Sequence, residues 1–240
     1  MSFPGFVDCH SHVCPSGDDG AATVADGAAL TREAARHGTA LLFATPHVWP
    51  HLSLTAEREA RIRSAFAELR PLAGLELRLG FELTPDRALL ADDPSRYRLE
   101  GTDCVLMEVP FDGPVDVLLA LVAHVEAAGL RPIVAHPERA EAVLADAGVA
   151  RELAARGLAL QVNASSLLGR HGPASAEAGW ELVERGEARL VASDGHRPAR
   201  PPHLDEAWRL VAARIGPERA RPLFDGSALG IAPAARRATA

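Results

Sequence analysis

Eight histidine, glutamate and aspartate residues follow apolar stretches of the chain, at the points where those stretches end. In chain order they are His10, His12, His47, Glu82, Glu108, His136, Asp194 and His196. Imidazole nitrogen and carboxylate oxygen are ligand atoms for divalent ions such as Mn²⁺, Fe²⁺ and Zn²⁺. So many ligands predict a centre that holds more than one ion. A centre of this kind is typical of metal-dependent hydrolases.

The spacing of these residues indicates the fold that would bring them together. The steps from His12 to His47 and from His47 to Glu82 are 35 residues each, and the later steps, with Asn163 ending one further apolar run, are 26 to 31 residues. One strand, one helix and their loops occupy about 30 residues. A parallel barrel gathers its strand ends on one face, where barrels of this class place their active sites. We therefore predict an α/β barrel.

Apolar runs separated by turn residues predict seven strands with helices between them. The predicted strands cover residues 3–10, 39–45, 75–81, 104–109, 131–135, 158–162 and 189–192. The predicted helices cover residues 21–37, 55–69, 115–128 and 138–156, with Gly148 as a candidate break in the last of these, and one more helix follows Pro201. Residues 84–98 are expected to be irregular, and the tail over residues 232–240 is expected to fray. No linker divides residues 1–240, so a single domain is expected.

Composition and charge exclude several classes of protein. A length of 240 residues, of which 48% are hydrophobic, suits one barrel with a substantial core. The net charge of −7, with scattered lysine and arginine, argues against nucleic-acid binding. The N-terminus lacks a signal-peptide pattern, and polar side chains interrupt the apolar stretch at 115–130, so no membrane insertion is expected. Three cysteines without a Cys-x-x-Cys motif favour the cytoplasm, and a homo-oligomer stays open.

Strand alternation predicts which side chains at the first strand meet. Asp8, His10 and His12 share one face of an extended chain, while Cys9 and Ser11 face the other way. His10 and His12 can therefore bind one ion, and Asp8 could position them. Asp194 and His196 repeat this arrangement at the last strand.

Other polar residues have an ordinary structural interpretation. His37, His124 and His171 fall at a helix end, within a helix and in a loop, and are interpreted as structural histidines. Asp18 and Asp19 could be turn or helix-capping residues, or one could be an oxygen ligand if a third ion is present, for which Asp19 is preferred.

The cysteines do not fit the chemistry of thiolate phosphatases. Such enzymes need an arginine six positions after the cysteine, and Pro15, Gly20 and Pro110 stand at those positions after the three cysteines. Cys9 and Cys104 are instead expected to pack as strand residues.

Arginine and aromatic residues adjoin the predicted ligands. Arg139 follows His136 by three positions, and Arg197 and Arg200 follow His196. Each could bind a phosphoryl oxygen or could be a surface arginine paired with a carboxylate. Trp49 and Phe111 follow strand-end ligands and could line a pocket for an aromatic ring or pack locally.

The motifs DCHSHVCPSGDDG, ATPH, GFE, MEVP, AHPER, QVNASS and ASDGH, in this order, resemble those of the PHP (polymerase and histidinol phosphatase) superfamily. More narrowly, they resemble the bacterial manganese-dependent tyrosine phosphatases of capsule and exopolysaccharide operons. The resemblance covers residues 6–204. It implies a distorted (β/α)7 TIM-like barrel with three divalent metal ions, expected to be Mn²⁺ with Fe²⁺ or Zn²⁺ as alternatives.

The resemblance also implies the roles of individual residues. His10, His12, Glu82 and Asp194 would hold one ion; Glu82, Glu108 and His136 a second; and Asp19, His47 and His196 a third. The superfamily often has histidine where this chain has Asp19 and Glu108, and this difference favours the phosphatase branch. Arg139 matches a phosphate-binding arginine, and Arg200 matches a second one better than Arg197, which stays open.

The expected reaction is metal-assisted hydrolysis of a phosphomonoester, with a metal-bound water as nucleophile. Arg139 would balance phosphoryl charge, and His47 or His196 would orient a water that donates a proton. The resemblance implies a phosphotyrosine protein, the tail of a bacterial tyrosine kinase, as substrate. The alternatives are a phosphoesterase for a small metabolite such as histidinol phosphate or for a nucleic-acid 3′ end, and a non-catalytic metal-binding module.

Overall fold

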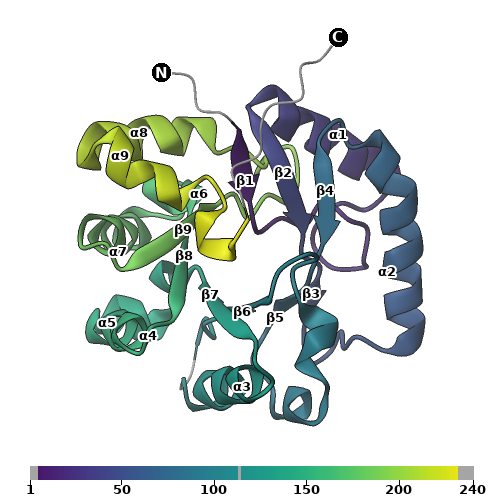
Figure 1. Cartoon of the computed structure of the whole chain (residues 1–240), viewed down its shortest axis with the longest axis horizontal. Helices are drawn as coiled ribbons and strands as arrows, with labels where there is room; N and C mark the ends of the chain where they lie inside the picture. Colours follow the sequence, from purple (N-terminus) through teal and green to yellow (C-terminus); the bar gives the residue numbers. More distant parts are fainter. Residues whose placement is uncertain (1–4, 113–114, 232–240) are drawn as a thin grey trace.

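The computed structural model describes residues 5–112 and 115–231, in which parallel strands are surrounded by helices (Figure 1). One group of strands is ordered β1-β2-β4 and a second is ordered β3-β5-β6-β7-β8-β9. The strands are β1 (Phe6–Asp8), β2 (Thr39–Ala44), β3 (His47–Val48), β4 (Glu76–Leu79), β5 (Glu82–Leu83), β6 (Cys104–Glu108), β7 (Arg131–Ala135), β8 (Ala159–Asn163) and β9 (Ala188–Ala192). Every pair of neighbouring strands is parallel.

Seven of the nine strands lie at the seven predicted positions, and the two-residue strands β3 and β5 lie just beyond the predicted strands over 39–45 and 75–81. β3 continues β2 after Pro46, and β5 continues β4. Hydrogen bonds carry the pairing across the division, from Gly80 N to Ala44 O at 2.8 Å and from Glu82 N to Pro46 O at 3.1 Å. Pro46 has no N–H to donate, so the regular ladder is interrupted beside it.

The barrel closes between the segments that follow β1 and β9. Ser11 forms a parallel bridge with Gly195, and the amide of His12 donates to Gly195 O at 2.7 Å. At the start of β1, the amide of Val7 instead donates to Phe224 O at 2.9 Å. Closure is therefore complete only at the end that carries the predicted ligands. The prediction of a distorted (β/α)7 barrel is confirmed.

Alternate residues of the strands belong to two apolar clusters. Leu106 and Ile133 pack in a smaller cluster inside the barrel, whereas Val105 and Val134 pack in a larger cluster that includes helix residues. Side chains on a strand alternate in this way, so Glu108 continues the inward series of β6. The polar centre therefore lies on top of an apolar barrel interior.

The helices connect and cover the strands (Figure 1). They are α1 (Val24–Arg36), α2 (Ala56–Leu69), α3 (Asp116–Ala127), α4 (Glu141–Ala145), α5 (Gly148–Ala155), α6 (Ala164–Leu167), α7 (Pro173–Glu184), α8 (Asp205–Ile215) and α9 (Pro217–Ala220). The 3-10 helices are η1 (Arg70–Leu72), η2 (Arg87–Ala91), η3 (Pro94–Tyr97), η4 (Pro137–Arg139), η5 (Arg221–Leu223) and η6 (Ser227–Leu229). Among the helices of the described ranges, none has both the length and the apolar character of a membrane span.

Two helix predictions are corrected. The first helix begins at Val24 rather than at residue 21, because extended Thr23 caps it and forms a capping box with Asp26. The predicted helix over 138–156 is three separate pieces, η4, α4 and α5. Ala140 and Asp146 are extended, and the Asp146 carboxylate accepts the amide of Gly148 at 2.7 Å, which confirms the candidate break. The tail at 232–240 lies outside the described residues.

Candidate metal centre

Four ligand atoms meet at the centre of the barrel mouth. The Nε2 atoms of His10 and His12 are 3.1 Å apart. Asp194 Oδ1 lies 3.4 Å from each of them, and Glu82 Oε2 lies 3.1 Å from the first and 3.3 Å from the second. Bonds of about 2.0–2.2 Å to one ion place neighbouring ligand atoms at about this separation. These four side chains come from the ends of three different strands and can hold one ion together.

A second group shares Glu82. The other carboxylate oxygen of Glu82, Oε1, lies 2.8 Å from His136 Nε2, and Glu108 Oε2 lies 3.9 Å from the same nitrogen. The Thr84 hydroxyl donates to the remaining oxygen of Glu108 and so fixes the carboxylate. Because Glu82 contacts both groups, it can bridge two ions.

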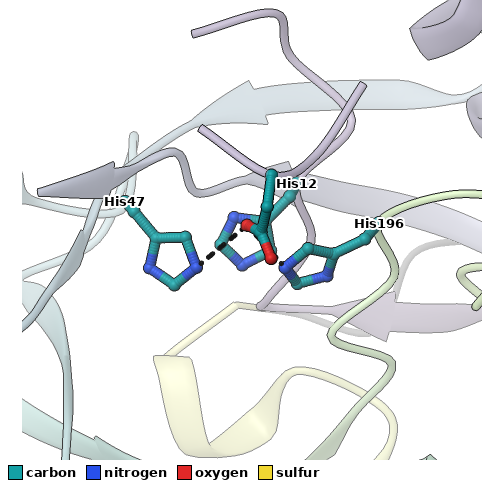
Figure 2. Close-up of side chains that lie close together, drawn as sticks. His12, His47 and His196 are labelled. Atoms are coloured by element: carbon teal, nitrogen blue, oxygen red, sulfur yellow. Dashed lines mark ion pairs between the residues drawn. The ribbon is translucent and has the colours of Figure 1, made fainter. Parts of the chain in front are cut away.

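A third group lies beside the first. Asp19 Oδ1 is 3.6 Å from His47 Nε2 and 3.3 Å from His196 Nε2. Figure 2 shows the rings of His47 and His196 on either side of His12, and its dashed lines mark ion pairs in this group. All nine predicted ligands therefore belong to three adjoining groups. Asp19, at 48% exposure, is the most accessible of these side chains.

The arrangement fits cations rather than internal hydrogen bonds. His47 Nδ1 and Glu82 Oε2 are 2.9 Å apart, yet neither atom makes a hydrogen bond, and Glu108 Oε2 is also buried without a partner. Buried acceptors without donors cost free energy. Divalent ions would satisfy these lone pairs, and the mixture of imidazole and carboxylate suits Mn²⁺, Fe²⁺ or Zn²⁺.

The electrostatic environment shifts the pKa values of Glu82 and Glu108 in opposite directions. Burial and the neighbouring charge of Glu82 raise the pKa of Glu108 to about 8. Burial would also raise the pKa of Glu82, but His10 and His47 hold it well below its usual range. Burial lowers the pKa of His136, which favours the neutral ring that binds a metal. The raised pKa means that the buried Glu108 carboxyl group tends to keep its proton. A metal ion beside Glu108 would stabilise the carboxylate and replace that proton.

Three positioning residues were not identified from the sequence. Gln161 Oε1 lies 2.9 Å from His10 Nδ1, its amide donates to Asn163 Oδ1 at 2.8 Å, and Asn163 donates to Asp194 Oδ2 at 2.7 Å. Asp18 Oδ2 lies 3.5 Å from His12 Nδ1 and accepts the amide of His47 at 3.1 Å. Partners of this kind orient metal-binding side chains.

The sequence contains only weak indications that Gln161, Asn163 and Asp18 position the ligands. Gln161 and Asn163 alternate along β8 and so face the same way, and Asp18 adjoins the predicted ligand Asp19. The predicted positioning residue Asp8 acts on the backbone instead of an imidazole. Its Oδ1 accepts the amide of Ser193 at 3.0 Å and lies 3.4 Å from the amide nitrogen of His10.

Two ligands have left-handed backbone conformations. His136 has φ 34° and Asp194 has φ 53°, and these are the only non-glycine residues with positive φ in the described chain. Ala135 belongs to the inner cluster, so a continued strand would direct the next side chain outward. The unusual φ lets His136 reach Glu82 instead. Such conformations are unfavourable and concentrate at functional sites.

The predicted phosphate-binding arginines differ in position. Arg139 Nη1 donates to Asp194 Oδ2 at 3.1 Å, and Arg200 pairs with the same oxygen. Arg197 is exposed and donates from Nε to the backbone carbonyl of Asp19 at 2.8 Å. Arg139 and Arg200 therefore point at the three groups of candidate ligands, and Arg197 supports the loop of Asp19.

A cavity of about 370 Å³ opens onto the ligands, and aromatic side chains line it together with Arg139 and Arg200. Trp49 stacks on His47 with ring centroids 4.2 Å apart. Phe111 stacks on His136 at 5.6 Å and an interplanar angle of 12°, and Arg139 lies 4.9 Å from its centroid. A larger cavity, of about 690 Å³, contains none of the nine ligands.

Residues predicted to be structural lie apart from the three groups. His124 Nε2 lies 2.8 Å from the carbonyl of Asp92, and Ser166 Oγ lies 3.0 Å from His171 Nδ1. Cys9 and Cys104 are buried in the inner apolar cluster, as predicted. His37 caps α1 but also joins another cluster of polar side chains, which is described below.

Comparisons with known proteins agree with this geometry. The family model described as "Capsular polysaccharide synthesis, CpsB/CapC" matches residues 6–231. The tyrosine-protein phosphatase YwqE of Bacillus subtilis is 31% identical over 88% of this chain and 86% of its own length. The tyrosine-protein phosphatase CpsB of Streptococcus agalactiae (strain 2603 V/R) is 28% identical over 94% of this chain and 97% of its own.

A solved structure superimposes on this chain with a TM-score of 0.81. It comes from a study of YwqE from Bacillus subtilis and CpsB from Streptococcus pneumoniae, which are described there as unique metal-dependent tyrosine phosphatases. It is 29% identical and covers 90% of each chain. The resemblance that the motifs predicted is confirmed, and the chain belongs to the CpsB/CapC family of capsular polysaccharide synthesis.

Proposed function

We propose that this chain is a metal-dependent phosphatase that hydrolyses phosphotyrosine in proteins. The convergence of nine histidine and carboxylate side chains beneath a cavity that two arginines line carries the proposal. Relatives that match most of the chain are tyrosine-protein phosphatases, and this favours phosphotyrosine over a small metabolite. The complete ligand set opposes the alternative of a non-catalytic module.

The residues divide the work of hydrolysis. Three divalent ions, for which we propose Mn²⁺, would be held by His10, His12, Glu82, Asp194, Glu108, His136, Asp19, His47 and His196. When bound, such ions supply Lewis-acid chemistry: they acidify a water for attack on phosphorus and balance charge on the phosphoryl oxygens. Arg139 and Arg200 present guanidinium groups that match the geometry of phosphoryl oxygens. Both guanidinium groups contact the anionic Asp194 Oδ2, and a phosphoryl oxygen can bind to the same guanidinium groups beside it.

Proton transfer to the leaving group places little demand on this site. A phenolate leaves without full protonation, unlike the alkoxide of a serine phosphate. His196 Nδ1 lies 2.9 Å from the carbonyl of Asp194, which directs the Nε2 lone pair toward Asp19. His47 and His196 therefore act as ligands that orient a proton-donating water, rather than as direct acids.

Aromatic side chains at the cavity would select the ring of phosphotyrosine. Phe111 is 44% exposed, although its lower face packs on His136. Trp49 lines the same cavity over His47. An exposed large apolar side chain beside a charged centre has a natural partner in an aromatic ring. We propose that the substrate is the phosphorylated tail of a cytoplasmic tyrosine kinase that controls capsule or exopolysaccharide synthesis.

The proposed function is tested by comparing substrates. With Mn²⁺, the protein should hydrolyse a phosphotyrosine peptide much faster than the same peptide with phosphoserine, and faster than histidinol phosphate. Phosphate release should stop on chelation and return when Mn²⁺ is added. Equal rates on all three substrates would contradict tyrosine specificity, and turnover that survives chelation would contradict the metal mechanism.

Replacing Phe111 with Ala should raise KM for the phosphotyrosine peptide by about three- to tenfold, because a ring contact contributes about 0.5–1.5 kcal/mol. The exchange should leave KM for a small alkyl phosphate almost unchanged, since that substrate has no ring. Leu144→Ala is a matched control, because Leu144 is also exposed, at 42%, and does not line the cavity. Equal losses on both substrates would show that Phe111 only supports His136.

A further inference from the structure

A second cluster of metal-type ligands lies outside the barrel mouth and shares no residue with the nine ligands. It consists of Glu33 and His37 at the end of α1 and His203 in the loop before α8. Glu33 Oε1 lies 3.3 Å from His37 Nε2 and 3.4 Å from His203 Nε2. The two imidazole rings stack with centroids 3.6 Å apart. Segments far apart in the sequence thus bring three ligand atoms together.

Neighbouring charges determine which atoms face the middle of this cluster. Asp205 Oδ1 lies 3.1 Å from His37 Nδ1, so this nitrogen carries the proton and Nε2 presents its lone pair to Glu33. The other oxygen of Glu33 already accepts Nε of Arg36 at 3.0 Å. His203 Nε2 is buried and makes no hydrogen bond. Two imidazole nitrogens and one carboxylate oxygen therefore lie within 4.8 Å of one another.

We propose that Glu33, His37 and His203 form a separate Zn²⁺ site. Two imidazoles and one carboxylate are a common zinc ligand set, and Asp205 beside His37 supplies the carboxylate–histidine arrangement that orients such ligands. Small rotations of the stacked rings would direct both Nε2 atoms at one ion. The three side chains are 21–34% exposed, so water can complete the coordination.

An ion at this site would connect two segments of the fold. The loop between β9 and α8 carries Arg200 and ends near His203, whereas Glu33 and His37 belong to α1. A bound ion would tie this loop to the helix. An ion that binds only the folded state raises its stability.

Zinc content measured by equilibrium dialysis at low micromolar free Zn²⁺ tests the proposal. His203→Gln and Glu33→Gln should each bind one Zn²⁺ per chain fewer than the wild-type protein, whatever number the barrel mouth binds. His124→Gln is the matched control, because it removes an imidazole that belongs to none of the four ligand groups in the described chain, and it should bind the wild-type number.

Thermal unfolding gives a readout independent of stoichiometry. Zn²⁺ should raise Tm of the wild-type protein and of His124→Gln by more than it raises Tm of the two cluster variants. If either cluster variant does not fold in the presence of chelator, as judged by circular dichroism, His37→Gln replaces it. Equal zinc content in the wild-type protein and the folded cluster variants would overturn the proposal. Loss of phosphatase activity without loss of this ion would concern only the proposed function of the barrel mouth and not this zinc site.

Discussion

Replacing Asp194 with Ala will lower kcat/KM for a phosphotyrosine peptide by at least about 1000-fold, which corresponds to about 4 kcal/mol of transition-state stabilisation. Asp194 Oδ1 is 3.4 Å from the nearest nitrogens of both His10 and His12, so it belongs to the group at the centre of the site. Its Oδ2 accepts hydrogen bonds from Arg139 and Asn163. The exchange therefore removes a metal ligand and releases the arginine that we expect to bind phosphate.

The barrel should still fold in this variant. The inner and outer apolar clusters do not include Asp194, and they provide most of the packed interior. Removing the buried carboxylate that pairs with Arg139 and Arg200 will lower the unfolding free energy by about 3–5 kcal/mol. His136→Ala, which removes a ligand of the second group, should lose activity in the same way.

Three measurements check this prediction: phosphate release with saturating Mn²⁺, metal content, and the circular dichroism spectrum. Asp103→Ala is a suitable control, because Asp103 is an exposed carboxylate that pairs with Arg131 away from the ligands. Activity at the wild-type level in folded Asp194→Ala would show that the convergence of ligands is not the catalytic site.

The convergence of these side chains at the barrel mouth could be predicted from the sequence because two simple regularities determine the place of most of them. Eight of the nine, all except the loop residue Asp19, follow an apolar run, and parallel strands in a barrel present the ends of such runs on one face. Glu108 illustrates this, since it is the next inward residue after Cys104 and Leu106 on β6. Neither regularity requires knowledge of a loop conformation.

Features that depend on loop conformation could not be predicted in the same way. The left-handed φ of His136 reverses the direction that alternation assigns to its side chain. The helix predicted over 138–156 ignored the Pro137 turn and the extended Ala140, which divide it into three pieces. Asp18 looked like a turn residue because its contact with His12 spans a loop whose path the sequence does not specify.

The choice between Arg197 and Arg200 depended on a loop of the same kind. The amide of Arg200 donates to the carbonyl of Arg197 at 2.8 Å, and the amide of His196 donates to the carbonyl of Arg200 at 2.9 Å. This tight turn directs the two side chains apart. Arg200 reaches Asp194, whereas Arg197 reaches the backbone of Asp19.

Replacing Arg200 with Met should therefore lower kcat/KM by about 100- to 1000-fold, the usual loss when one group that stabilises transition-state charge is removed. Arg139→Met should show a loss of similar size. Arg197→Met is the matched control, because it removes the same charge from the same turn but not from the cavity. It should lower kcat/KM by less than about tenfold, since the hydrogen bond to the carbonyl of Asp19 supports a ligand only indirectly.

Inhibition by inorganic phosphate separates binding from folding in these variants. Phosphate should inhibit Arg197→Met as strongly as the wild-type protein and Arg200→Met much more weakly, because Arg200 pairs with Asp194 and lines the cavity, whereas Arg197 does not line it. Arg200→Lys retains the charge without the planar fork and should fall between them. Equal weakening in the Met variants at positions 197 and 200 would mean that net positive charge at the mouth, rather than a directed guanidinium, holds the phosphoryl group.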